Sequence, residues 1–170
     1  MNHMKPAETL KALIETSKVK SSTPIKRMVI FGIFAGAYIA FAGAGANMAA
    51  YGLLSSTETF GLGKILSGTI FTVGLIMVVL GGAELFTGNT TMIAAVIDKR
   101  ITVSSMLKNW VIVYICNFIG GVLIAFMVYY SGVLNSREGM LGALTVKIAA
   151  GQANMSFGSA FASGILCNWL

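Results

Sequence analysis

The chain has 170 residues, of which 56% are hydrophobic and only 11% are charged, whereas about 25% are charged in an average soluble domain. A soluble domain of this size cannot bury that much apolar surface, because most of its residues must touch water. The composition therefore excludes a water-soluble globular enzyme, a disordered tail and a disulfide scaffold, and it indicates an integral membrane protein. The formal net charge is +6, but the basic residues lie at the ends of apolar segments. We interpret them as topology signals rather than as a nucleic-acid surface.

Residues 1–27 are predicted to be an amphipathic segment on the cytoplasmic side. Within this segment, residues 6–20 favour a short helix at the membrane surface, because apolar and small side chains share one face. These are Leu10, Leu13, Ile14 and Ser17. The segment also contains six basic residues, which are Lys5, Lys11, Lys18, Lys20, Lys26 and Arg27. The apolar run that follows is too long for a signal peptide.

The first predicted membrane span covers Met28 to Leu54, which is long enough to cross the bilayer with some tilt. It contains Gly32 and Gly36, and small residues at this spacing let helix backbones approach closely. A contact within the chain and a contact between subunits both fit this pattern.

The second apolar segment, Ile65 to Ile97, is too long for a single straight span. Its 33 residues would make a helix about 50 Å long, against a hydrocarbon core of about 30 Å. The charges on either side allow one crossing only, so the segment is predicted to be interrupted. The pair Gly81-Gly82 and the polar run 87–91 mark the predicted break. Interrupted helices occur in membranes where the free backbone lines a cavity or is buried in protein.

A third span is predicted over Met106 to Val133, followed by a short surface helix over residues 139–151. A fourth apolar run starts near Asn154 and is short for a span at Leu170, so we expect the chain to stop partway through an element. In this topology nine of the 12 basic residues lie inside. The positive-inside rule thus predicts a cytoplasmic N-terminus, and we expect a multi-pass protein of the cell's inner membrane.

The polar residues at the predicted break are the candidate functional residues. Glu84 is the only acid within an apolar run, and a carboxylate at that depth costs several kcal/mol unless it is paired or solvated. It is either a structural acid, bonded to backbone N–H groups, or a residue that shapes the electrostatics of a polar path. Thr87 and Asn89 offer a hydroxyl and an amide beside exposed backbone, and such groups can orient a small polar solute.

Apolar side chains near the break have two possible roles. They either narrow a pore or simply pack between helices, and they are Phe71, Leu75, Leu85 and Phe86. The sequence contains no Ser/His/Asp set, paired catalytic carboxylates, phosphate loop or metal-ligand spacing. We therefore expect neither enzyme activity nor a cofactor.

Three segments resemble motifs of the formate/nitrite transporter family in order and spacing. They are Gly36–Phe41 (GAYIAF), Gly82–Asn89 (GAELFTGN) and Gly164–Leu170 (GILCNWL). The residues of these motifs are most similar to those of the hydrosulfide-channel and nitrite branches of the family.

This resemblance implies an all-α, aquaporin-like bundle of two inverted three-span repeats, assembled as a homopentamer. Residues 28–134 would form the first repeat, and residues 135–170 the incomplete start of the second. Each protomer would hold a pore for small monovalent anions such as formate, nitrite, hydrosulfide or lactate. Thr87 would face its central chamber, and the four apolar residues named above would form its constrictions.

The sequence departs from the family pattern in two places. Members usually have a central histidine in the fifth span, and this chain ends before that span, so we expect an N-terminal portion of a longer protein. The family also has a lysine twelve residues before the glycine of the third motif, where this chain has Gln152. That lysine is expected to attract anions and to pair with the acid at Glu84. Glu84 is therefore predicted to lack its usual partner, with Lys147 as a weak, off-face substitute.

The sequence-based prediction is a passive or proton-coupled channel for small monovalent anions. One alternative is an aquaporin-type channel for neutral solutes. Its paired Asn-Pro-Ala motifs are absent, since Pro6 and Pro24 are the only prolines and neither follows Asn. A second alternative is a membrane scaffold without transport activity, which leaves the polar break unexplained.

Overall fold

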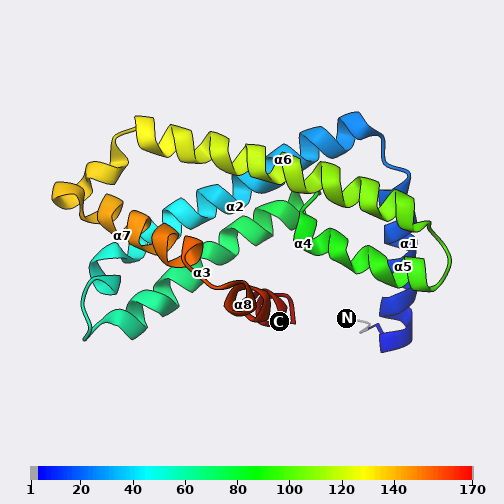
Figure 1. The fold of residues 1–170 in the computed structure, drawn as a ribbon, viewed down its shortest axis with the longest axis horizontal. Coiled ribbons are helices and arrows are strands. Elements are labelled where there is room, and N and C mark those ends of the chain that lie inside the picture. Colours follow the sequence, from blue (N-terminus) through cyan, green and yellow to red (C-terminus); the bar gives the residue numbers. More distant parts are fainter. Residues whose placement is uncertain (1–3, 170) are drawn as a thin grey trace. The chain divides into compact units, whose positions relative to one another are not determined.

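The computed structural model describes residues 4–169, and within them the side chains as far as Cys167. Every regular element in this range is a helix (Figure 1). In chain order they are α1 Pro6–Ser21, α2 Ile25–Leu54, α3 Phe60–Leu80, α4 Phe86–Asn89, η1 Thr90–Met92, α5 Ile93–Ile97, α6 Val103–Tyr130, η2 Val133–Asn135, α7 Ser136–Ala153 and α8 Phe157–Trp169. The last residue of the third motif, Leu170, lies outside the described residues.

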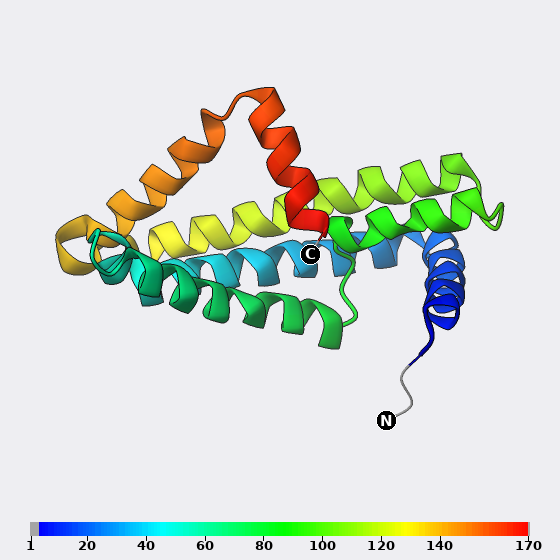
Figure 2. The same ribbon diagram turned by 90° about the horizontal axis from the view of Figure 1, so that it is seen from below.

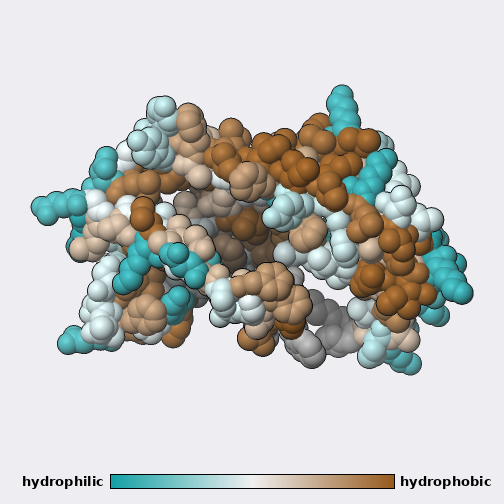
Figure 3. Space-filling model, viewed as in Figure 1, coloured by the Kyte–Doolittle hydropathy of each residue, from teal (hydrophilic) through white to brown (hydrophobic). Residues whose placement is uncertain are grey.

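Within residues 4–169, three helices are long and apolar enough to cross a membrane, namely α2, α3 and α6. Their positions confirm an all-α membrane protein with an interrupted second span, because α3 stops at Leu80 and a shorter apolar helix covers Phe86–Ile97. Large apolar side chains remain exposed along α6, among them Val111, Ile115 and Phe118. Figure 3 shows apolar side chains over much of this helix, as expected for a surface in contact with lipid.

The chain divides into two compact units. The first unit comprises Met1–Ala40 and Leu75–Ile124, and the second comprises Phe41–Gly74 and Ala125–Leu170. In the second unit α7 packs on η2, and the Thr59 hydroxyl donates to the Leu53 carbonyl at 2.9 Å, which closes the turn between α2 and α3. The first unit holds the break, and in it α6 lies beside α2 and beside α4 and α5 in Figures 1 and 2. A repeat boundary at residue 134 stays a prediction.

In the first unit, α2 and α6 cross with their backbones in contact. A Cβ atom added at Gly36 would lie 1.9 Å from the Asn117 carbonyl oxygen, and one added at Gly120 would lie 2.0 Å from the Ile33 carbonyl oxygen. A Cβ atom at Gly32 would lie 2.7 Å from the Cys116 side chain. Of the two alternatives for the small-residue motif, the structure therefore shows the contact within the chain.

This crossing predicts opposite effects on stability for alanine substitutions at two adjacent glycines of α6. Gly120→Ala should lower the free energy of unfolding by about 1–3 kcal/mol, because its methyl group would push α2 away. A Cβ atom at Gly121 meets nothing within 4 Å, so Gly121→Ala should raise the stability by about 0.5–1 kcal/mol through the better helix propensity of alanine. Unfolding in graded mixtures of SDS and mild detergent measures both values. Equal effects of the two variants would contradict the close crossing.

Candidate functional site

The break in the second span starts with a glycine-dependent helix cap. The Gly82 N–H donates to the Val79 carbonyl at 3.2 Å, and the Ala83 N–H donates to the Val78 carbonyl at 3.0 Å, which is the bond pattern of a Schellman motif. Gly82 has a φ of 59°, a conformation that glycine adopts without steric cost. The predicted pair Gly81-Gly82 thus marks the end of α3. The polar run 87–91 lies not in the break but in α4 and η1, so the break is shorter than the sequence suggested.

The backbone groups that the break frees are bonded to α2 and α6. The Glu84 N–H donates to the Phe31 carbonyl of α2 at 3.2 Å. The Asn117 side chain of α6 accepts from the Phe86 N–H at 2.9 Å and donates to the Glu84 carbonyl at 2.9 Å. The same amide donates to the Gly32 carbonyl at 2.8 Å. These bonds matter because a free N–H or C=O in hydrocarbon costs several kcal/mol.

The side chain of Glu84 belongs to a charged and amide network. Its Oε2 lies 3.0 Å from Lys20 Nζ, and the two side chains are only 13% and 25% exposed. Asn89 Nδ2 donates to the same oxygen at 2.8 Å and to Asn109 Oδ1 at 2.8 Å. Lys20 Nζ also donates to Asn89 Oδ1, and Trp110 Nε1 donates to the Asn89 carbonyl at 2.8 Å. The cation beside Glu84 is thus Lys20 of the N-terminal helix, a partner that the sequence analysis did not name.

Docking of α1 on the rest of the first unit brings Lys20 to this position. The helix contacts η1 and α5, and Ser17 on its expected apolar face is 2% exposed. Asn109 Nδ2 lies 3.5 Å from the Lys20 carbonyl and 3.4 Å from Met28 Sδ, which ties the end of α1 to α6 and α2. Within the described residues, each buried side-chain nitrogen and oxygen has a hydrogen-bond partner, as stable burial of polar groups requires.

The other predicted residues near the break take different positions. Thr87 is exposed on α4, and Leu85 is half-buried just before that helix. The Phe86 ring contacts Trp110 and Tyr114 edge-on, with centroids 6.1 and 5.3 Å apart. The structure thus brings Glu84 and Asn89 together, leaves Thr87 exposed, and places the Phe86 ring against two aromatic side chains of α6.

The remaining predicted residues are not members of the polar network. Leu75 is 50% exposed on α3, within the first unit. Phe71, Lys147 and Gln152 belong to the second unit, where all three are exposed. Their roles in a solute path stay predictions.

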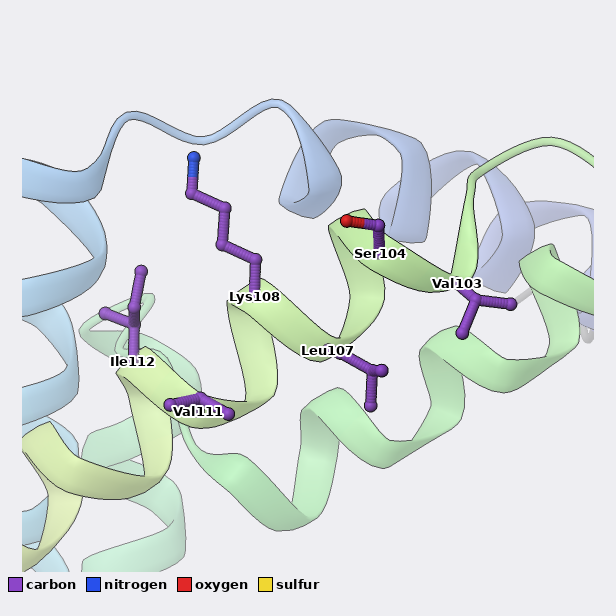
Figure 4. A pocket seen from close by; sticks show the side chains of 6 residues that line it. All are labelled: Val103, Ser104, Leu107, Lys108, Val111 and Ile112. Atoms are coloured by element: carbon purple, nitrogen blue, oxygen red, sulfur yellow. The ribbon is translucent and has the colours of Figure 1, made fainter.

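An open hollow of about 600 Å³ lies along an exposed side of α6. Figure 4 shows that its lining residues all come from this one helix, and they are Val103, Ser104, Leu107, Lys108, Val111 and Ile112. It includes no residue of the polar network, so it is not the candidate site.

Sequence reasoning missed Lys20 as a network member and missed Asn109, Trp110 and Asn117 altogether. A usable signal existed for the two asparagines, because amides inside an otherwise apolar span need bonded partners. Their spacing of eight residues also places them close to the same side of α6, roughly 80° apart by helix geometry.

Comparisons with known proteins agree with one another. The family model described as "Formate/nitrite transporter" matches residues 7–170. A "Probable formate transporter" of Methanothermobacter thermautotrophicus is 35% identical over 179 residues, covering 97% of this chain and 65% of that protein. A "Formate channel BtFdhC" of Bacillus thuringiensis is 38% identical, covering 98% of this chain and 63% of that protein. A "Formate channel FocA" of Haemophilus influenzae is 37% identical, covering 81% and 48%. The chain thus spans between about half and two thirds of the length of these relatives.

The network predicts unequal effects for two lysines of α1. Lys20→Met should lower the free energy of unfolding by about 2 kcal/mol, because it leaves the mostly buried Glu84 carboxylate without its cation. Lys18 pairs with Glu15 at 2.9 Å on an exposed surface, so Lys18→Met should change the stability by less than about 0.5 kcal/mol. Adding Glu84→Gln to Lys20→Met should restore part of the loss, measured as a double-mutant cycle by SDS unfolding. A Lys20 effect no larger than the Lys18 effect would refute the buried pair.

Proposed function

The chain belongs to the formate/nitrite transporter family, and from this premise we propose that it forms part of a channel or transporter for small monovalent anions. The observation that carries the proposal is the break in the second span, whose acid is neutralised by Lys20 at 3.0 Å. A helix interrupted within a membrane is tolerated where its free backbone lines a cavity or is buried in protein. The break therefore supports a polar path through this part of the membrane.

The short apolar helix Phe86–Ile97, here called the half-helix, supplies backbone hydrogen-bond donors for an anion at its N-terminal end. The first N–H groups of a helix have no partner four residues earlier, and the N-terminal end of the helix dipole favours negative charge. Asn117 accepts from the Phe86 N–H, which leaves the N–H groups of Thr87 and Gly88. Together with the exposed Thr87 hydroxyl, they replace part of the water shell that a small anion loses.

The pairing of Glu84 with Lys20 makes this end of the half-helix compatible with an anion. An unpaired carboxylate in the turn before Thr87 would repel a negatively charged solute, and the repulsion would be strong in a medium of low dielectric constant. Lys20 removes that repulsion, and the excess of basic over acidic residues in the chain, a formal net charge of +6, favours anions. A neutral solute would need neither feature.

Selectivity by size and hydration is assigned to the apolar residues. In our proposal Phe71, Leu75, Leu85 and Phe86 form constrictions that exclude hydrated ions, so that a desolvated or protonated small acid passes most easily. Formate is the first substrate to test, because the relatives are called formate channels or transporters; nitrite and hydrosulfide are the next. The proposed setting is the inner membrane, with a cytoplasmic N-terminus and a homopentameric assembly.

Flux measurements in proteoliposomes test this proposal directly. We expect the longer protein predicted from the sequence, here called the full-length form, to carry formate, nitrite or hydrosulfide. In the full-length form, Thr87→Val should lower the flux of the preferred anion about tenfold, because one hydrogen bond of about 1.4 kcal/mol is lost. Thr91→Val is the control, since that hydroxyl already donates to the Gly88 carbonyl at 2.7 Å.

Two results of these measurements would count against the proposal. Flux of water or glycerol without any anion flux would favour the aquaporin-type alternative. Absence of all solute flux from the full-length form would instead favour a membrane scaffold.

Gln152 gives a second test of the anion path. Gln152→Lys adds a cation where the family pattern has one, and it should raise anion flux most strongly at low ionic strength, where screening is weak. Gln152→Met is the matched control, because it has a similar length and no charge. Unchanged flux of every anion in Gln152→Lys would show that a charge at this position does not serve the path.

A further inference from the structure

The Asn117 side chain of α6 bonds to the backbone on both sides of Leu85, the extended residue in the break. Asn117 donates to the Glu84 carbonyl at 2.9 Å and accepts from the Phe86 N–H at 2.9 Å. Between these groups lies Leu85, which is extended with φ −100° and ψ 130°. The amide therefore pairs with the chain around Leu85 much as the backbone of a neighbouring β-strand would.

The remaining donor of Asn117 anchors this pairing to α2. Its Nδ2 also donates to the Gly32 carbonyl at 2.8 Å. That carbonyl is within reach because Gly36 and Gly120 allow the backbones of α2 and α6 to touch. Since the side chain, the break and the contacting parts of both helices belong to the first unit, the amide is held in place at three points.

We propose that Asn117 is a positioning residue that determines the solute specificity of the break. This inference rests on the proposed function. By bonding the Glu84 carbonyl, Asn117 removes from the path an oxygen that would otherwise attract water or a cation. By bonding the Phe86 N–H, it fixes the start of the half-helix and therefore the direction of the Thr87 and Gly88 N–H groups.

Loss of the amide has a chemical consequence beyond lower stability. A free carbonyl and a free N–H in an apolar setting must recruit water or move until they find partners. The half-helix then no longer presents its donors at one fixed distance. Discrimination between a small anion and a larger one should fall, because a loosely held site accommodates both.

Substitutions at Asn117 and at one nearby residue test the proposal. Asn117→Leu keeps the approximate shape and removes all three bonds, whereas Asn117→Gln keeps the amide on a longer stem. Val113→Ala is the control for stability, because Val113 is 0% exposed, lies one turn earlier on α6 and has no polar atom in its side chain. We measure the ratio of formate flux to lactate flux in proteoliposomes of the full-length form.

Asn117→Leu should lower this ratio about tenfold, as expected for the loss of a fixed hydrogen-bond geometry. Asn117→Gln should recover part of it, and Val113→Ala should leave it unchanged even though it destabilises the protein. An unchanged ratio in Asn117→Leu, or an equal fall in Val113→Ala, would overturn the proposal and reduce Asn117 to a structural residue.

Hydrogen exchange separates this inference from the proposed function. In detergent, Asn117→Leu should accelerate exchange of the Phe86 amide, because its acceptor is gone, and Val113→Ala should not. Unchanged exchange in Asn117→Leu would refute the positioning role. Absence of anion flux from the unchanged protein would instead refute the proposed function, while the exchange result would still decide whether Asn117 positions the break.

Discussion

The structure of the first unit depends on bonding the backbone groups that a helix break frees inside a membrane-spanning segment. Water cannot satisfy these groups in hydrocarbon, so protein groups must. A glycine cap bonds the end of α3, the Phe31 carbonyl accepts from Glu84, and Asn117 bonds Glu84 and Phe86. Without these partners, a continuous helix would be the more stable form of this segment.

This bonding in turn requires the close crossing of α2 and α6. Carbonyls of a helix normally point along its axis and are shielded by side chains. Gly36 and Gly120 remove that shield, since a Cβ atom at either position would lie 2.0 Å or less from a backbone oxygen of the other helix. Close packing, a bonded break and a half-helix with a fixed start are therefore one arrangement rather than three separate features.

The parts of the site that the sequence predicted are those encoded locally. Segment length and flanking charge predicted one interrupted crossing, and Gly81-Gly82 predicted where α3 ends. The partners of the break were not predictable in this way, because they lie far apart in sequence. Lys20 and Glu84 are separated by 64 residues, and Asn117 and Phe86 by 31. The family pattern directed attention to Gln152, whereas the cation beside Glu84 comes from the N-terminal helix, whose docking no local pattern encodes.

The Glu84 carboxylate bonds the side chains of Lys20 and Asn89 rather than the backbone N–H groups considered from the sequence, and its role in a polar path stays a proposal. The N–H, the carbonyl and the Oε2 of this residue are all bonded to protein groups, so Glu84 is a structural acid that joins α1, α2, α4 and α6. Lys20 pairs with the same carboxylate, so the break holds no unpaired charge at this residue. An acid engaged in this way is not available to bind a solute. In the proposed function, the groups that meet an anion are therefore the Thr87 hydroxyl and the N–H groups of Thr87 and Gly88, and the residues around them determine how firmly those donors are held.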